Sequence, residues 1–317
     1  RITEFADKLL WTDPPQADWP KHLRVGQNGW IGKSEGLLFT APVKNSSMKI
    51  QTFSAHFEAF YADTFVVIAP DHPLLAELVA DVPNKQEILN FANKIVNKRK
   101  EREYGMEIKE IEGIFTGKYI VDPVGNGDLP IWVASYALKD YGTGIVKCSV
   151  HDERDFAFAK KYGLWLKPVL FPKDAKLKKK VENLEVCFTD MKNGFLSEPE
   201  EFAGMQAGKI REEIMEYAIK KGFAQKSIQY HLRDWSISRQ RYWGTPIPII
   251  YCDKCGTVPV PEKDLPVELP YKVDYAPKGK APLATAEDWV NTECPKCGGP
   301  SKREIETMDT FVDSAWY

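Results

Sequence analysis

The sequence predicts an α+β fold, in which a β-rich domain with peripheral helices is followed by a small zinc-ribbon module. Three observations lead to this prediction. Short runs of β-branched and aromatic residues alternate with glycine and proline, several segments repeat apolar residues at helical spacing, and two Cys-x-x-Cys pairs lie near the end of the chain. With 317 residues, of which 43% are hydrophobic, the chain can form two or three compact units.

The β-rich domain is predicted from its strand-like runs. Each run is bounded by glycine or proline, which interrupt regular structure and mark turns. The predicted strands span residues 48–53, 64–69, 113–122, 131–135 and 143–149.

Peripheral helices are predicted where apolar residues recur every three or four positions. The first lies around residues 88–96, and a second around 210–218 ends before Gly222, a typical position for a C-terminal glycine. A third is predicted to begin after Asp152, which can cap it, and to end before Gly163.

Two polar segments are predicted to have no core role. Residues 173–180 are rich in lysine, and we expect a solvated loop there in preference to an RNA contact. Residues 1–28 hold a short helical pattern and then a turn with Pro14, Pro15 and Pro20, which indicates a connector.

The charge balance argues against a uniformly basic, DNA-binding protein. The chain has 43 lysines and arginines against 45 acidic residues, so any RNA site must be local. No signal-peptide pattern or membrane-length apolar run is present in the sequence, and we expect no membrane partner. The chain starts at Arg1 without methionine, and both ends are expected to be cut.

The cysteines predict a structural metal site. The two pairs are Cys252 with Cys255 and Cys294 with Cys297, and each pair is followed by glycine. Four thiolates form a closed tetrahedral site typical of structural Zn²⁺, although a degenerate knuckle with reduced thiols is the alternative. Paired cysteines of this kind suit a reducing, cytoplasmic setting. Cys148 and Cys187 stand alone and are expected to be small buried hydrophobes.

Two motifs bracket most of the chain. Residues 234–248 read DWSISRQRYWGTPIP and residues 29–36 read GWIGKSEG. They resemble the segments that follow and precede the editing insertion of bacterial-type leucyl-tRNA synthetases. Arginines and aromatics alternate in residues 235–248, which suits either a nucleic-acid contact or packing against the synthetic body.

The resemblance implies a domain order and a barrel-like class I synthetase editing domain. The predicted order is a linker (1–32), the editing domain (33–224), a return linker (225–250), the zinc ribbon (251–300) and the start of a synthetic-domain segment (301–317). The HIGH and KMSKS signatures of such enzymes are absent from the sequence, so ATP and Mg²⁺ are expected only in the full-length enzyme.

The function implied by the resemblance is proofreading. The full-length enzyme would attach leucine to tRNA(Leu) with ATP, and this region would hydrolyse the ester at a tRNA(Leu) 3′ end that carries a noncognate amino acid. A second site is needed because one methyl group changes binding by only about 1–3 kcal/mol. The alternative is a noncatalytic module that positions tRNA and has a degenerate editing pocket. The expected partners are the charged tRNA end and the rest of the synthetase.

The resemblance also implies a substrate anchor. Gly142-Thr143-Gly144 and the run His151, Asp152, Arg154 and Asp155 match the family's glycine-threonine-glycine strand and helix start. Asp155 would bind the substrate ammonium by a charge-assisted hydrogen bond. The alternative is that Asp155 has only a structural role, because the helix dipole favours an aspartate in the first turn. Tyr141 would lie near the terminal adenosine, and Arg154 would reach a phosphate or brace the neighbouring aspartates.

The loop expected to face the ester departs from the family pattern. Ser54, His56, Glu58 and Ala59 stand where relatives usually carry Thr-Thr-Arg-Pro-Asp-Thr, and Ala59 takes the place of a leucine-excluding threonine. Two interpretations remain: a rebuilt pocket in which His56 or Glu58 activates water and Ser54 stabilises the oxyanion, or weakened proofreading. His56 and Glu58 are predicted to face the same side of a strand, and the hydrolysis needs no metal.

Overall fold

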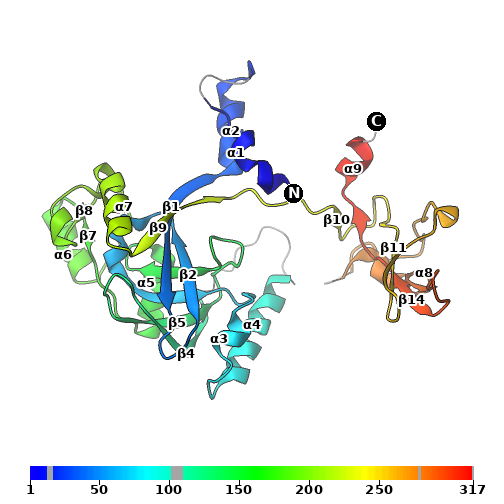
Figure 1. The fold of residues 1–317 in the computed structure, drawn as a ribbon, viewed down its shortest axis with the longest axis horizontal. Coiled ribbons are helices and arrows are strands. Elements are labelled where there is room, and N and C mark those ends of the chain that lie inside the picture. The colour runs from blue at the N-terminus through cyan, green and yellow to red at the C-terminus, as the bar shows by residue number, and fades with distance from the viewer. Residues whose placement is uncertain (13–16, 101–109, 278–279, 316–317) are drawn as a thin grey trace. The chain divides into compact units, whose positions relative to one another are not determined.

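The computed structural model describes residues 1–12, 17–100, 110–277 and 280–315. It divides into a larger unit, Phe5–Leu232, and a smaller unit formed by Arg1–Glu4 with Arg233–Tyr317 (Figure 1). Pro14 and Pro15 of the predicted connector lie outside the described residues. Within those residues, every helix is too short or too polar to cross a membrane.

The larger unit contains most of the regular structure. Its helices are α1 (Ala6–Leu9), α2 (Lys21–Ile31), α3 (Leu75–Leu78), α4 (Lys85–Lys100), α5 (Glu153–Tyr162), α6 (Ala175–Glu182) and α7 (Arg211–Lys220). Its strands are β1 (Lys33–Pro42), β2 (Lys49–Ser54), β3 (Asp63–Ile68), β4 (Gly113–Val121), β5 (Asp128–Ala134), β6 (Ile145–Ser149), β7 (Leu170–Phe171), β8 (Phe195–Leu196) and β9 (Ala224–Tyr230). Short 3₁₀ helices include η2 (Phe57–Ala62) and η4 (Ala207–Lys209).

The strands form open sheets. One sheet has the order β2-β1-β9 and a second has the order β4-β5-β3-β6, in which β3 and β5 are parallel and the other pairs antiparallel. The α+β class and the five predicted strands are confirmed. The pairing of the described residues closes no barrel, so the barrel-like expectation is not met in that form.

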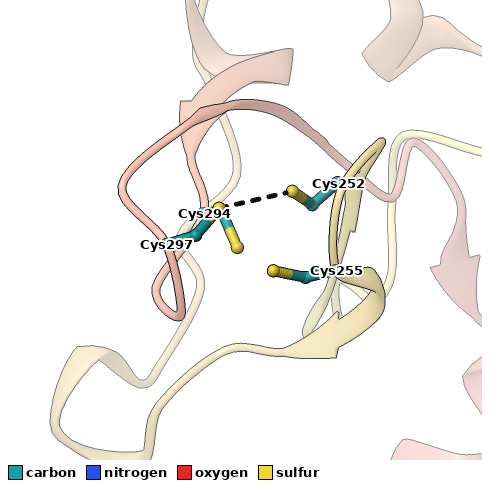
Figure 2. Close-up of side chains that lie close together, drawn as sticks. All are labelled: Cys252, Cys255, Cys294 and Cys297. Carbon is teal, nitrogen blue, oxygen red and sulfur yellow. Dashed lines mark hydrogen bonds between the residues drawn. The ribbon is translucent and has the colours of Figure 1, made fainter.

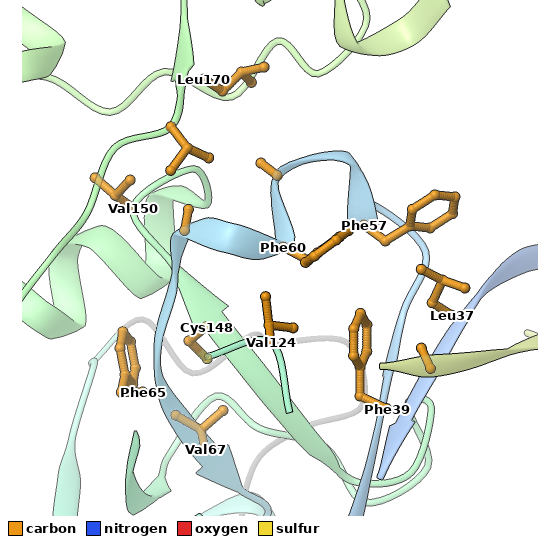
Figure 3. Close-up of a cluster of buried hydrophobic side chains, with 14 of the residues drawn as sticks. Leu37, Phe39, Phe57, Phe60, Phe65, Val67, Val124, Cys148, Val150 and Leu170 are labelled. Atoms are coloured by element: carbon orange, nitrogen blue, oxygen red, sulfur yellow. The ribbon is translucent and has the colours of Figure 1, made fainter. Parts of the chain in front are cut away.

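Strand β3 lies between two apolar clusters. Phe65 and Val67 point into one cluster, which Figure 3 shows together with aromatic residues of β1 and η2. Val66 and Ile68 point into the other cluster, which α3 and α4 help to form. Because side chains alternate along a strand, an apolar run without alternation fits a strand buried on both faces. Full burial of a valine, isoleucine or phenylalanine side chain contributes about 1.5–3 kcal/mol to the free energy of unfolding.

Strand β1 was not predicted, because it begins with polar residues and its apolar residues do not alternate regularly with polar ones. It pairs with β2 on one side and β9 on the other. At Gly36 an added Cβ would lie 2.2 Å from the carbonyl oxygen of Ser54, so only glycine allows this close approach. Residues 224–230, at the predicted start of the return linker, therefore complete a sheet. Helix α2 was also not predicted.

The three predicted helices are confirmed as α4, α7 and α5. The Asp152 side chain accepts hydrogen bonds from the backbone N–H groups of Arg154 and Asp155, at 2.8 and 3.1 Å, and caps α5. Gly163, with φ of 64°, ends this helix in the left-handed conformation.

The lysine-rich segment is solvated as predicted, but it is a helix and not a loop. Asp174 accepts a hydrogen bond from the N–H of Leu177 at 2.7 Å and caps α6, and Val181 anchors the helix in the interior. Lysine is a good helix former, so its charge does not prevent a helix once a cap and one buried contact are present.

The smaller unit is built from hairpins. Its main sheet has the order β12-β11-β14-β13, and β10 pairs with β15. The strands are β10 (Ser238–Arg239), β11 (Ile249–Cys252), β12 (Gly256–Pro259), β13 (Asn291–Glu293), β14 (Pro300–Arg303) and β15 (Thr307–Met308), and the helices are α8 (Glu287–Val290) and α9 (Thr310–Ala315). Among the described residues, its buried apolar cluster consists of Cys252, Val258 and Cys294.

Candidate active site and metal centre

A cavity of about 1180 Å³ opens in the larger unit. One wall, the α5 wall, is formed by the start of α5 and the residues before it. A second wall, the loop wall, is formed by the end of β2 and the residues after it, together with Arg211: Phe53, Ser54, Ala55, His56 and Glu58. The segment 189–192 and Tyr136 complete the lining. The volume slightly exceeds the about 300–1,000 Å³ that is typical of ligand pockets, so a large ligand such as a nucleotide carrying an amino acid can be accommodated.

Asp155 provides a buried carboxyl group on the α5 wall. The residue is 8% exposed and lines the cavity. Its Oδ1 accepts a hydrogen bond from the hydroxyl of Tyr136 at 2.8 Å. Burial, and next the charge of Asp152, raises the pKa of Asp155 to about 7. An acid of this kind is partly neutral near neutral pH and becomes fully ionised when a cation binds beside it.

His151 fixes the α5 wall but has no free nitrogen. Its Nδ1 lies 2.8 Å from the carbonyl oxygen of Phe188, and its Nε2 accepts from the N–H groups of Val169 and Leu170, both at 3.1 Å. Because Nε2 accepts, Nδ1 carries the proton. Burial lowers the pKa of His151 to about 4, so the ring is neutral at physiological pH.

The Gly142–Gly144 turn lies next to β2. Thr143 Oγ1 donates to the carbonyl oxygen of Gln51 in β2, at 2.7 Å, and His72 Nε2 lies 3.0 Å from the carbonyl oxygen of Thr143. At Gly144, whose φ is 76°, an added Cβ would lie 2.9 Å from the carbonyl oxygen of Lys139. The turn residues therefore connect β2 to β6. They are not among the described residues that line the cavity.

Tyr141 and Arg154 lie at the rim of the cavity. Tyr141 is 45% exposed, and its ring is available to a ligand. The guanidinium of Arg154 is exposed and lies 6.0 Å from the ring centroid of Tyr136. An exposed ring and an exposed cation suit contacts with a nucleotide base and a phosphate.

The loop wall differs from its predicted conformation. Strand β2 ends at Ser54, His56 is exposed, and Glu58 lies in η2. His56 and Glu58 therefore do not share one face of a strand. The chain turns here because Phe57 and Phe60 are buried in the apolar cluster shown in Figure 3.

Glu58 and Ala59 have different surroundings. Glu58 is 6% exposed, lines the cavity and forms an ion pair with Arg211. Ala59 is 4% exposed and packs in the apolar cluster, and it is not among the described cavity-lining residues.

Lys147 and two aspartates form a buried ionic cluster that was not predicted. Lys147 Nζ lies 3.1 Å from Asp63 and 2.8 Å from Asp122, and 4.6 Å from the ring centroid of Phe39. Burial raises the pKa of Asp63 to about 6. Lys147 and Asp63 line the cavity, and a lysine within an apolar strand was the available sequence signal. Arg211 carried no comparable signal.

The four paired cysteines converge in the smaller unit (Figure 2). One pair lies at the tip of the β11–β12 hairpin and the other between β13 and β14, and the pairing of β11 with β14 brings the tips together. The four sulfur atoms lie within 4.8 Å of one another, and those of Cys252 and Cys297 are 3.7 Å apart. Tetrahedral zinc with bonds of about 2.3 Å requires sulfurs about 3.8 Å apart. The cluster therefore fits a zinc ion.

The lone cysteines lie in the larger unit. Cys148 is buried, as predicted, whereas Cys187 is half-buried.

Comparison with known proteins places this arrangement among the synthetases. Residues 158–317 match the class I tRNA synthetases for I, L, M and V. Residues 28–219 match the editing domain of leucyl-tRNA synthetase, and the chain belongs to this family.

Similar proteins carry the same name. The leucine-tRNA ligases of Fervidobacterium nodosum and Thermosipho melanesiensis are 46% and 45% identical over 318 residues, and that of Thermotoga maritima is 43% identical. Each comparison covers 100% of this chain and 38% of the relative, so the chain spans less than two fifths of their length.

A solved structure shows the same fold. It is the Agrobacterium radiobacter LeuRS in a ternary complex with tRNA and LeuAMS, which is 34% identical with a TM-score of 0.66. The comparison covers 100% of this chain and 35% of the LeuRS chain.

Proposed function

We propose that this chain hydrolyses the ester between a noncognate amino acid and the 3′ end of tRNA(Leu). One observation carries the proposal: the carboxyl group of Asp155 is buried and yet lines a cavity large enough for an aminoacyl nucleotide. Membership of the leucyl-tRNA synthetase editing-domain family supports the choice of substrate.

Asp155 anchors the substrate in this proposal. The substrate ammonium binds the carboxylate, which keeps its hydrogen bond from Tyr136. A charge-assisted hydrogen bond in a buried site is stronger than one in water, and it fixes the ester relative to the loop wall. Tyr141 stacks on the terminal base, and Arg154 reaches the phosphate backbone.

The loop wall carries the chemistry. A water oxygen forms a bond to the ester carbonyl carbon, its proton passes to Glu58, and the bond to the ribose oxygen breaks as that oxygen takes up the proton. Ser54, the backbone amides of the loop and the substrate hydroxyls stabilise the oxyanion, and His56 helps to orient the water. Ala59 packs in the core, so we assign the exclusion of leucine to side chains that line the cavity.

The smaller unit completes the proposal. A structural Zn²⁺ is held by the four paired cysteines, Cys252, Cys255, Cys294 and Cys297, in a ribbon that spans residues 251–300. The linkers and the editing domain, residues 33–224, keep the bounds that the sequence predicts. In the full-length cytoplasmic enzyme, the rest of the synthetase would use ATP and Mg²⁺ to attach leucine.

A deacylation assay tests the function. The chain is incubated with isoleucyl- and norvalyl-tRNA(Leu), with leucyl-tRNA(Leu) as the specificity control. Hydrolysis of the first two that is lost in Asp155→Ala supports the proposal. No hydrolysis by the intact chain would instead support the noncatalytic tRNA-positioning module.

A further inference from the structure

Arg211, the first residue of α7, joins three elements at the cavity. Its Nη1 donates to Glu58 Oε1, and its Nη2 donates to the carbonyl oxygens of Ala55, at 2.8 Å, and Glu35, at 3.1 Å. The guanidinium carbon lies 4.2 Å from the ring centroid of Phe57. One side chain thus connects α7 to β1, to the residue that follows β2 and to η2.

The guanidinium geometry suits this task. A planar fork can donate to several acceptors at once while its face lies on an aromatic ring, whereas a lysine ammonium has no such fork. Arg211 is 153 residues from Glu58, so the contact depends on the tertiary fold and not on local sequence.

One carboxylate oxygen of Glu58 has no hydrogen-bond partner among the described residues. Its Oε1 is bound by Arg211, while its Oε2 is buried and has no hydrogen-bond partner among the described residues. A buried oxygen without a donor is unfavourable, so the ion pair with Arg211 is the described contact that stabilises this carboxylate. The ion pair with Arg211 sets the direction in which this oxygen points.

We propose that Arg211 is the positioning residue of the loop wall. It holds the Glu58 carboxylate in the cavity wall, where this group accepts the proton of the attacking water or of a ribose hydroxyl. Arg211 acts through Glu58 and does not touch the reacting atoms. The inference rests on the proposed hydrolysis and names a further residue on which that reaction depends.

The kinetic test compares Arg211→Met and Arg211→Lys with the unchanged chain in the deacylation assay. Arg211→Met is expected to lower kcat by about 100-fold, the loss that a displacement of about 1 Å at a reacting group can cause. KM should stay nearly constant, because Asp155 and the nucleotide contacts are retained. The kcat of Arg211→Lys should lie between that of Arg211→Met and that of the unchanged chain. Lys220→Met, at the exposed end of the same helix, is the matched control and should keep full activity.

A double variant tests whether Arg211 acts through Glu58. Glu58→Gln removes the base but keeps an oxygen that Arg211 can bind. If Arg211 acts through Glu58, then Arg211→Met with Glu58→Gln is no less active than Glu58→Gln alone. Fully additive losses would overturn the inference, because a merely structural arginine would lower activity independently of Glu58.

Amide hydrogen exchange separates this inference from the proposed function. Exchange in residues 54–58 should accelerate in Arg211→Met and stay unchanged in Lys220→Met. If the unchanged chain hydrolyses its substrate and Arg211→Met is equally active, the inference fails and the function stands. If the unchanged chain is inactive, the function fails, and unaltered exchange in Arg211→Met would reject the positioning role as well. Should Arg211→Met not fold, Arg211→Lys gives the same readouts.

Discussion

The two walls of the cavity are held in different ways. The α5 wall is fixed in part by neighbours in sequence, since Asp152 caps the helix on which Asp155 lies. The loop wall is fixed by Arg211, which comes from a helix 153 residues further along the chain. In the proposed function, substrate anchoring therefore follows from a local motif, while the proposed chemistry depends on a long-range contact.

The largest effect is expected on the α5 wall. Asp155→Ala should lower kcat/KM for isoleucyl-tRNA(Leu) by about 100-fold, since a hydrogen bond to a charged group contributes up to about 3 kcal/mol. Steady-state deacylation measures the loss. Lys220→Met is the control. Full activity in Asp155→Ala would show that the α5 wall does not bind the substrate in the reaction.

A somewhat smaller effect is expected from the buried histidine. His151→Leu leaves the N–H groups of Val169 and Leu170 and the carbonyl oxygen of Phe188 without their partner, so the free energy of unfolding should fall by about 2 kcal/mol. Urea denaturation measures it. His56→Ala on the loop wall is the matched control, because His56 is exposed. Equal losses in both variants would contradict the contrast between the walls.

The pH dependence of deacylation should give the next largest effect, and it should depend on Asp155 of the α5 wall. Burial raises the pKa of Asp155 to about 7, and only the ionised form binds an ammonium. Log kcat/KM should therefore rise with pH below 7 and level off above it, changing about tenfold between pH 6 and 8. This rise should disappear in Asp155→Asn.

The ionisation of Asp155 should have the opposite effect on stability: the free energy of unfolding should fall as pH rises, whereas kcat/KM should increase. An acid with a raised folded pKa stabilises the fold fully below its unfolded pKa and loses that contribution as pH rises through about 7. Asp155→Asn should thus flatten the fall in stability between pH 4 and 7. A slope identical to that of the unchanged chain would show that Asp155 is ionised throughout.

The smallest effect is expected at the helix cap. Asp152→Ala removes the acceptor for the N–H groups of Arg154 and Asp155, and loss of such a cap costs about 1 kcal/mol. For a unit of this size Tm should fall by about 2–4 °C. Asp152→Asn should retain most of the stability, because asparagine also caps helices. A loss in Asp152→Asn equal to that in Asp152→Ala would show that charge, and not capping, matters.

Much of the α5 wall could be predicted from sequence because its determinants are contiguous. The cap at Asp152, the helix ending before Gly163 and the neighbouring glycine turn lie within one short stretch. The zinc-binding pattern was equally visible, since paired cysteines at fixed spacing need only two hairpins to meet. The burial of both His151 nitrogens was not visible, because their partners lie in other segments.

The loop wall could not be predicted in the same way. Alternation placed His56 and Glu58 on one strand, but the burial of Phe57 and Phe60 turns the chain into a 3₁₀ helix. Tertiary burial thus outweighed the local pattern. Arg211 lies in a helix whose pattern reveals the buried face but not the partner of an arginine at its start.

Strand β3 has a consequence for how the larger unit melts. Its alternate side chains belong to two different apolar clusters, so neither cluster can come apart without exposing half of the same strand. Regions that share such an element open together as one cooperative block. Fluorescent reporters placed in either cluster should therefore trace a single, superimposable denaturation curve.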